Sequence, residues 1–169
     1  MGEGVGYSGH KHQKWAKELS IADNNEFIIA PLNVKPVNLH DSTLLPQSLD
    51  DLADMADLVG FDLSDSFLTL DSGFDGILNK RRIELLEMIP VIKPNRRGTK
   101  DEKKLERMYE NFNEQIYKTR FTVERTFGWQ DTYRKLVILY ETLDYTHNGF
   151  KYLAYSIMNL RVVFGKNSL

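Results

Sequence analysis

The pattern of apolar and polar positions predicts two strands near the start of the chain, over residues 14–22 and 26–34. They flank an Asp-Asn-Asn sequence at 23–25, and Asp and Asn tolerate the positive φ angles of tight turns. The second strand contains the run Phe-Ile-Ile-Ala at 27–30, which is apolar on both faces. Such a run is typical of the middle of a sheet, so the pattern predicts a hairpin whose second strand is central.

Apolar residues recur at helical spacing after His40, Asp41 and Ser42, which together offer an N-cap. The later expected elements are a strand over 66–70, a helix over 74–85, a strand over 88–92, a basic loop over 93–99, a long helix over 101–126 and a last helix over 150–164. The long helix carries one core-type stripe of Leu105, Met108, Phe112, Ile116, Val123 and Phe127. Strands that alternate with helices predict an α/β fold with a mixed sheet, in one domain over residues 1–169.

The composition narrows the class of function. The chain has no cysteine, which excludes disulfides and thiolate metal sites, and no apolar run approaches the roughly 20 residues of a membrane span. The net charge of −2 conceals an asymmetry: residues 40–75 hold nine Asp and no Lys or Arg, whereas residues 76–135 hold fifteen Lys or Arg against nine Asp or Glu. A basic second half suits a phosphate backbone, although the charges taken alone favour a solvated helix face.

An Asp at the end of a buried strand is the first candidate for chemistry. Asp71 follows the apolar strand predicted over 66–70 and precedes a Ser-Gly turn. Ligands of α/β sheets bind at the carboxyl ends of the strands, and a carboxylate there can hold Mg²⁺. From this segment alone, an ordinary helix N-cap is an equally good interpretation of Asp71.

Three polar residues are predicted to share one face of the long helix. Tyr117, Arg120 and Glu124 have the spacing i, i+3, i+7. A Glu that is fixed by a neighbouring Arg is a candidate metal ligand or phosphate-site partner. The alternative is an ordinary Glu–Arg surface pair, worth about 0.3 kcal/mol.

A basic loop with Lys93, Arg96 and Arg97 follows the strand predicted over 88–92. We expect this loop to lie beside the strand that ends in Asp71. DNA strand cleavage requires such an arrangement, because phosphates must be held while metal ions polarise the scissile bond. A basic surface turn is the alternative.

Five segments, in chain order, resemble the transposases of bacterial insertion sequences of the Asp-Asp-Glu, group-five type. They are Gly-Tyr-Ser-Gly-His-Lys at 6–11, Asn-Leu-His-Asp-Ser at 38–42, Leu-Asp-Ser-Gly-Phe-Asp at 70–75, Pro-Val-Ile-Lys-Pro-Asn-Arg at 90–96 and Tyr-Lys-Thr-Arg-Phe-Thr-Val-Glu-Arg-Thr-Phe at 117–127. Residues 150–161 are similar to the closing helix of that family. Each motif is weak by itself, but five in order across nearly the whole chain are specific.

The resemblance implies a ribonuclease-H-like fold in which three carboxylates bind two divalent ions, Mg²⁺ or Mn²⁺, for cleavage and strand transfer of transposon-end DNA. By motif match, Asp71 takes the place of the second carboxylate and Glu124 that of the third, while Tyr117 and Arg120 complete a Tyr-x-x-Arg-x-x-x-Glu signature. The expected DNA contacts are Lys93, Arg96, Arg97, Lys118, Arg120 and Arg125. The resemblance also implies a bacterial cytoplasmic, nucleoid-associated location and no membrane partner.

The sequence departs from the family pattern at its N-terminal end. The family's first Asp lies on a strand just before the segment matched by residues 4–9, and here only Met1, Gly2 and Glu3 precede that segment. We therefore expect a partial catalytic domain without its first strand and first Asp. Such a chain should bind DNA in a salt-dependent way without cutting it alone. Its expected partners are DNA and either another transposase chain or the missing N-terminal segment.

Two other functions stay open at this point. One is a non-catalytic, transposase-derived protein that binds DNA or a transposase. The other is an unrelated metal-dependent nuclease with the same use of carboxylates. An upstream coding segment that ends in a strand with an Asp would favour the transposase, whereas intergenic sequence there would favour the binding protein.

Overall fold

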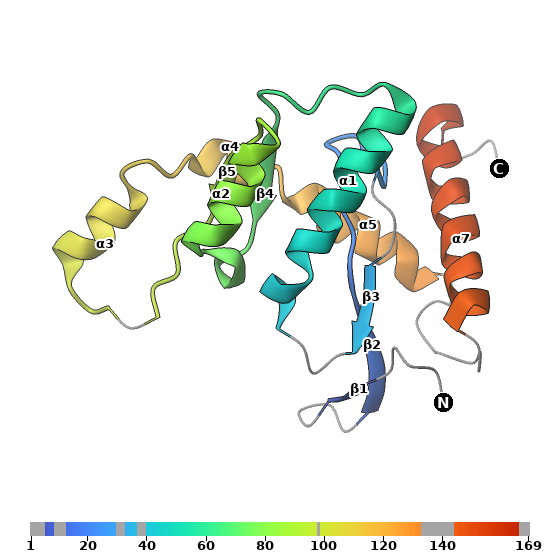
Figure 1. The fold of residues 1–169 in the computed structure, drawn as a ribbon, viewed down its shortest axis with the longest axis horizontal. Coiled ribbons are helices and arrows are strands. Elements are labelled where there is room, and N and C mark those ends of the chain that lie inside the picture. The colour runs from blue at the N-terminus through green and yellow to red at the C-terminus, as the bar shows by residue number, and fades with distance from the viewer. Residues whose placement is uncertain are drawn as a thin grey trace. The chain divides into compact units, whose positions relative to one another are not determined.

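The structure is a computed structural model that describes residues 6–8, 13–29, 33–36, 40–97, 99–132 and 144–165 of the 169-residue chain (Figure 1). The chain divides into two compact units. Unit 1 comprises Met1–Met55 together with Phe121–Leu169, and unit 2 comprises Ala56–Arg120. The α/β class is confirmed, since strands of both orientations occur together with flanking helices, although the strands lie in two sheets.

Unit 1 contains an antiparallel sheet of three strands, β1 (Gly6–Ser8), β2 (Gln13–Leu19) and β3 (Asn33–Pro36), with β2 in the middle. The strand predicted over 14–22 is confirmed in place, but the central strand predicted over 26–34 is wrong. In its place, Ile28 makes an isolated bridge to Ala22, and β3 begins only at Asn33.

The physical reason for this difference lies in the turn before Ile28. The carboxylate of Asp23 accepts hydrogen bonds from the backbone N–H groups of Asn25 and Phe27, both at 2.8 Å, so the turn is closed by a side chain. Ile28 then pairs its own N–H and C=O with the side-chain amide of Asn159, at 3.0 and 3.1 Å. These backbone groups are thereby satisfied without a neighbouring strand.

The helices of unit 1 begin with a short 3₁₀ turn, η1 (Asp41–Thr43), which His40 caps by accepting the Ser42 N–H on its side chain. Helix α1 (Leu45–Val59) follows and continues into unit 2. The predicted cap and helix are therefore confirmed. The remaining helices described in unit 1 are α5 (Phe121–Thr132) and α7 (Asp144–Phe164).

The core of unit 1 contains a cluster of Ile28 with Tyr155 and Met158 of α7, against which Trp129 of α5 packs. The first turns of α1 bury Leu45 and Leu49, as their helical spacing predicts. The turn at Ile28 is therefore part of the core of unit 1, although it is not part of a strand.

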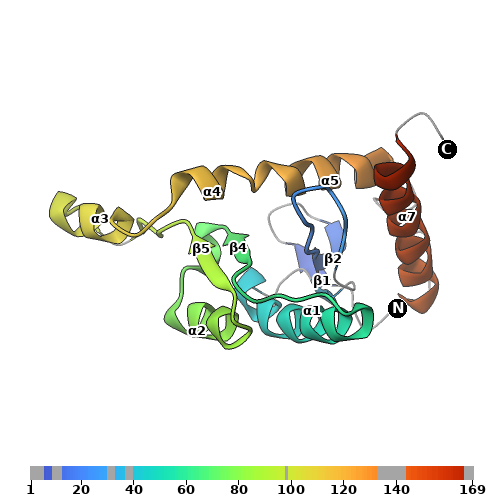
Figure 2. The ribbon, with the colours of Figure 1, turned by 90° about the horizontal axis from the view of Figure 1, so that it is seen from above.

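Unit 2 is built on a parallel pair of strands, β4 (Phe67–Leu70) and β5 (Ile89–Ile92), in the places that the sequence predicts. A 3₁₀ turn, η2 (Ser72–Phe74), and helix α2 (Ile77–Leu85) connect them. Figure 2 shows the strand pair between α2 and α4 (Glu114–Lys118), both of which contact it. The core consists of Leu68, Phe74, Ile83, Met88, Val91 and Ile92.

The long helix predicted over 101–126 is wrong as a single element, because α3 (Glu102–Tyr109), α4 and α5 divide it. The side chain of Asn113 accepts a hydrogen bond from the backbone N–H of Ile116, so it caps a new helix where a continuous one was expected. The predicted core stripe is interrupted accordingly, and Phe127 at its end is 41% exposed. Among the described helices, none is long and apolar enough to cross a membrane.

Candidate active site

Asp71 directly follows β4, at the carboxyl end of the parallel pair. Its backbone occupies the N-cap position of η2, but its side chain makes no capping hydrogen bond. The carboxylate, which is 54% exposed, contacts Tyr117 and Arg120 instead. The structure therefore decides against a capping role for this side chain.

Tyr117 and Arg120 hold both oxygens of the Asp71 carboxylate. The Tyr117 hydroxyl donates to Oδ1 at 3.2 Å, and Arg120 donates from Nη1 to Oδ2 at 3.3 Å and reaches Oδ1 from Nη2 at 3.2 Å. The guanidinium carbon of Arg120 also lies 5.8 Å from the centre of the Tyr117 ring. Because α4 contacts both β4 and β5, its last turn brings Tyr117, and the turn after it brings Arg120, to the end of the sheet.

The electrostatics of this cluster keep Tyr117 a hydrogen-bond donor. Burial raises the pKa of the Tyr117 hydroxyl above its ordinary value; the charge of Arg120 opposes this shift, and the carboxylate of Asp71 adds to it. The hydroxyl therefore stays protonated at neutral pH. The partners of Asp71 are 46 and 49 residues away in sequence, so the helical spacing that singled them out gave no sign of this contact.

Glu124 lies in the first turn of α5 with an exposed side chain. The continuous helix predicted to carry Tyr117, Arg120 and Glu124 is wrong, because α4 ends at Lys118 and α5 begins at Phe121. Tyr117 and Arg120 nevertheless meet at Asp71, whereas the place of Glu124 on the same face stays a prediction. Asp71 belongs to unit 2 and Glu124 to unit 1, so their predicted approach stays a prediction. Among the residues that the structure describes, no three His, Asp or Glu side chains lie together as a metal site.

The basic loop begins beside Asp71, as expected from the sequence. The backbone N–H of Lys93 donates to the C=O of Leu70 at 3.2 Å, which continues the pairing of β4 and β5 by one step. Two residues later, the backbone N–H of Asn95 donates to the carboxylate of Asp75 at 2.8 Å, and Lys80 pairs with the same carboxylate at 2.7 Å. The loop is therefore tied to the segment that carries Asp71.

Asp75 closes the motif at 70–75, but the sequence reasoning left it without a role. Its side chain is 13% exposed. Burial alone would raise the pKa of Asp75, but the hydrogen bonds from Lys80 and the Asn95 N–H, with the charge of Lys80, lower it below its ordinary value. Asp75 is therefore a charged structural link between α2 and the basic loop.

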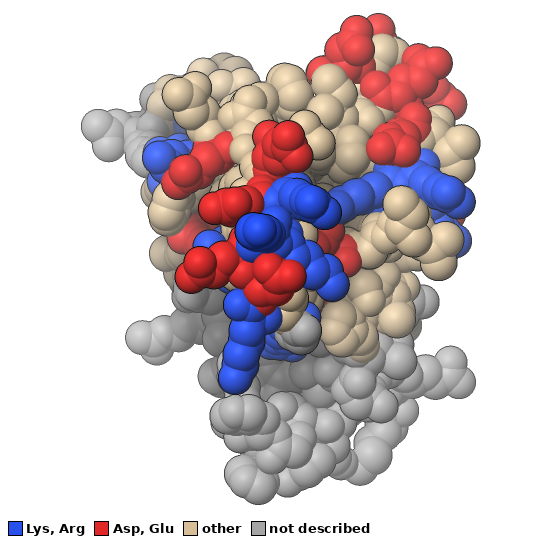
Figure 3. All heavy atoms as spheres, turned by 90° about the vertical axis from the view of Figure 1, so that its left-hand side faces the viewer, with Lys and Arg blue, Asp and Glu red and all other residues tan. Residues whose placement is uncertain are grey.

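The expected DNA contacts have different surroundings. Arg96 donates from Nε to the Tyr109 hydroxyl at 3.0 Å and lies 5.0 Å from the centre of that ring, so it fastens the loop to α3. Lys118 pairs loosely with Glu114 at 3.7 Å, and Lys93 and Arg97 are exposed. Figure 3 shows the face that carries α3, where basic and acidic side chains are interspersed. Contact of these residues with DNA stays a prediction.

The comparison with known families identifies the family of the chain. The family model described as Transposase DDE domain matches residues 2–157. No curated protein and no solved structure matches the chain. The family match supports the ribonuclease-H-like α/β class, and a transposase family implies a DNA substrate. The chain belongs to the Transposase DDE domain family.

Proposed function

We propose that the chain serves in metal-dependent cleavage and strand transfer at the ends of an insertion sequence, with Asp71 and Glu124 as two of the metal-binding carboxylates. The observation that carries this proposal is the position of Asp71. Its carboxylate stands half-exposed at the carboxyl end of a parallel strand and is oriented by α4 instead of capping a helix. Ligands of α/β sheets bind at this edge.

The chemistry of Asp71 fits a hard divalent cation. Mg²⁺ takes oxygen ligands, keeps several waters and accepts one or two protein carboxylates. A carboxylate has about four lone-pair sites, and the three contacts from Tyr117 and Arg120 leave room for one further partner. When bound, Mg²⁺ or Mn²⁺ would polarise the scissile phosphodiester. The proposal requires Glu124 to approach Asp71 in the working enzyme.

The chain's own residues would hold the carboxylate and the DNA. Tyr117 and Arg120 restrict the rotation of Asp71, so that its oxygens are ordered before a cation arrives. The backbone of Lys93 is hydrogen-bonded to that of Leu70, the last residue of β4. The basic loop that begins at Lys93 would hold phosphates beside the reacting bond. A nucleoid-associated, cytoplasmic location and pairing with a further transposase chain belong to this proposal.

A second candidate function, that of a non-catalytic DNA- or transposase-binding protein, is favoured by the same ion pair. Arg120 pairs with the charge of Asp71, as Lys80 pairs with that of Asp75. Under this candidate, Asp71 needs no cation, and the basic loop alone would bind DNA.

A Mn²⁺ titration followed by electron paramagnetic resonance separates the two candidates. We expect Asp71→Asn and Glu124→Gln each to weaken Mn²⁺ binding by about tenfold or more, as loss of a ligand does. Asp75→Asn is the matched control, since its carboxylate lies in the same segment but is occupied by Lys80 and Asn95, and it should leave the affinity unchanged. Unchanged Mn²⁺ affinity in Asp71→Asn would overturn the metal assignment in favour of the binding protein.

A further inference from the structure

We infer that Glu26 is a positioning residue for Glu124, acting through an ion pair with Arg125, the neighbour of Glu124 on α5. The inference rests on the proposed function, because it assigns a purpose to the placement of Glu124. It concerns contacts within unit 1 only, to which Glu26, Glu124 and Arg125 all belong.

The backbone of Glu26 has an unusual conformation for a residue with a side chain. Its φ angle is +72°, in the left-handed region that favours glycine. A residue stays in this region when its surroundings determine its position strongly. Here the Asp23 carboxylate binds the N–H groups of Asn25 and Phe27, and the Asp23 N–H donates to the Phe27 C=O at 2.9 Å, so the turn is held on both sides of Glu26.

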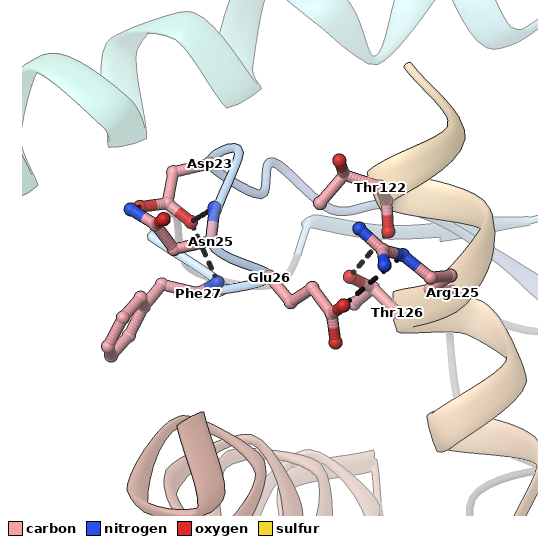
Figure 4. A network of polar contacts seen from close by, with 7 residues as sticks. All are labelled: Asp23, Asn25, Glu26, Phe27, Thr122, Arg125 and Thr126. Atoms are coloured by element: carbon pink, nitrogen blue, oxygen red, sulfur yellow. Dashed lines mark hydrogen bonds and ion pairs between the residues drawn. The ribbon is translucent and has the colours of Figure 1, made fainter. Parts of the chain in front are cut away.

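This conformation directs the Glu26 side chain to α5. Figure 4 shows it reaching from the turn toward Arg125, whose Nε lies 3.2 Å from the Glu26 carboxylate. The Glu26 side chain is 15% exposed and that of Arg125 is 62% exposed, so the carboxylate is shielded from water while the guanidinium is reached by it. The sequence predicted Arg125 as a DNA contact, whereas the structure gives its charge a partner inside unit 1.

The same stretch of α5 is buried on its inner face. Thr122 is 9% exposed and Thr126 is fully buried, and the Thr126 hydroxyl donates to the Thr122 C=O at 3.2 Å. Glu124 and Arg125 lie within the turn that these two threonines delimit. Fixing Arg125 therefore fixes the backbone from which the Glu124 side chain starts.

The turn itself is anchored to α7. Two residues after Glu26, the backbone of Ile28 is bound at both polar atoms by the side-chain amide of Asn159. The turn consequently connects α7 through Ile28 to α5 through Glu26. We describe the residues 23–28 as a brace that holds the first turns of α5.

Amide hydrogen exchange over residues 121–128 tests the brace without any metal or DNA. Glu26→Gln keeps the size of the side chain and removes its charge, and we expect exchange to accelerate by about fivefold, as for a partly buried ion pair. The charge-swapped double variant Glu26→Arg with Arg125→Glu keeps an opposite-charge pair and should return exchange to within about twofold of the wild-type chain. Arg125→Gln removes the other half of the same pair and should accelerate exchange to the same extent.

The Mn²⁺ titration on the same variants tests the positioning of Glu124. We expect Glu26→Gln to weaken Mn²⁺ binding by about threefold, less than Glu124→Gln does, and the charge swap to restore it. If amide exchange over residues 121–128 is unchanged in Glu26→Gln, the bracing role of residues 23–28 is wrong, whatever the effect of Glu124→Gln on Mn²⁺ binding. Faster exchange with unchanged Mn²⁺ affinity, while Glu124→Gln lowers that affinity, would overturn the positioning role and leave the proposed function intact. If Glu124→Gln has no effect on Mn²⁺, the proposed function fails and the positioning role fails with it.

Discussion

The ion pair between Asp71 and Arg120 can be measured by a double-mutant cycle of Asp71→Asn, Arg120→Gln and the two changes combined. Asp71→Asn keeps the size of the side chain, Arg120→Gln keeps its polar character with a shorter stem, and each removes one charge. The cycle isolates the direct interaction, because effects of each residue on its other neighbours cancel in the difference.

The expected coupling follows from the geometry and the exposure of the pair. Arg120 approaches both carboxylate oxygens, at 3.2 and 3.3 Å, which places the pair among the stronger, two-point contacts. The Asp71 side chain is 54% exposed and that of Arg120 is 27% exposed, so solvent screens much of the attraction. We expect a coupling free energy of about 0.5–1 kcal/mol at low salt, at the upper end for exposed pairs.

Urea unfolding of the four chains measures this coupling, and a repeat at about 0.5 M salt should roughly halve it because screening shortens the range of the interaction. Tyr117→Phe is a useful comparison, since it removes one hydrogen bond to the same carboxylate and should cost about 1 kcal/mol without a comparable salt dependence. Coupling below about 0.2 kcal/mol at low salt would refute the view that Arg120 holds Asp71 in solution.

Three further predictions concern other parts of the chain. Glu87 follows α2 with a φ of +58° and its N–H bonded to the C=O of Glu84, in a helix-ending motif that favours glycine, so Glu87→Gly should raise stability by about 1 kcal/mol relative to Glu87→Ala in thermal unfolding. The pKa of Asp75 is lowered in the folded chain, so the stability that its charge contributes is present above the ordinary pKa and is lost as pH falls through the folded pKa. Asp75→Asn should therefore be less stable than the wild-type chain at pH 7, and the difference should vanish in unfolding experiments at acid pH. In DNA-binding titrations against salt, Arg97→Gln should reduce the slope by about 1, whereas Arg125→Gln should leave it unchanged; equal slopes for both variants would contradict the separate roles given to them.

The elements of unit 2 could be predicted from the sequence because their signals are local. The run that forms β4 is apolar and is followed by Asp71 and a turn, and the run that forms β5 precedes a loop with Pro94. The cap at Asn113 was also a local signal, and an Asn before Glu114 could have located the break in the long helix.

The contacts that complete the site could not be predicted, because they join distant parts of the chain. Arg120 finds Asp71 across 49 residues, and the helical spacing suggested Glu124 as its neighbour. The strand expected around Ile28 is replaced by a contact with Asn159, 131 residues away. A single sequence shows how well a segment suits a strand, but it does not show which distant group will satisfy its backbone.

The pairing of Asn159 with Ile28 has a consequence for how this sequence can diverge. Both hydrogen bonds end on main-chain atoms of residue 28, so any residue except proline presents the same N–H and C=O there. Position 28 can therefore accept other apolar side chains of similar volume, whereas position 159 requires the Asn side chain, whose amide makes both hydrogen bonds. Among diverged copies of this gene, we expect Val and Leu to occur at position 28, whereas position 159 should remain Asn.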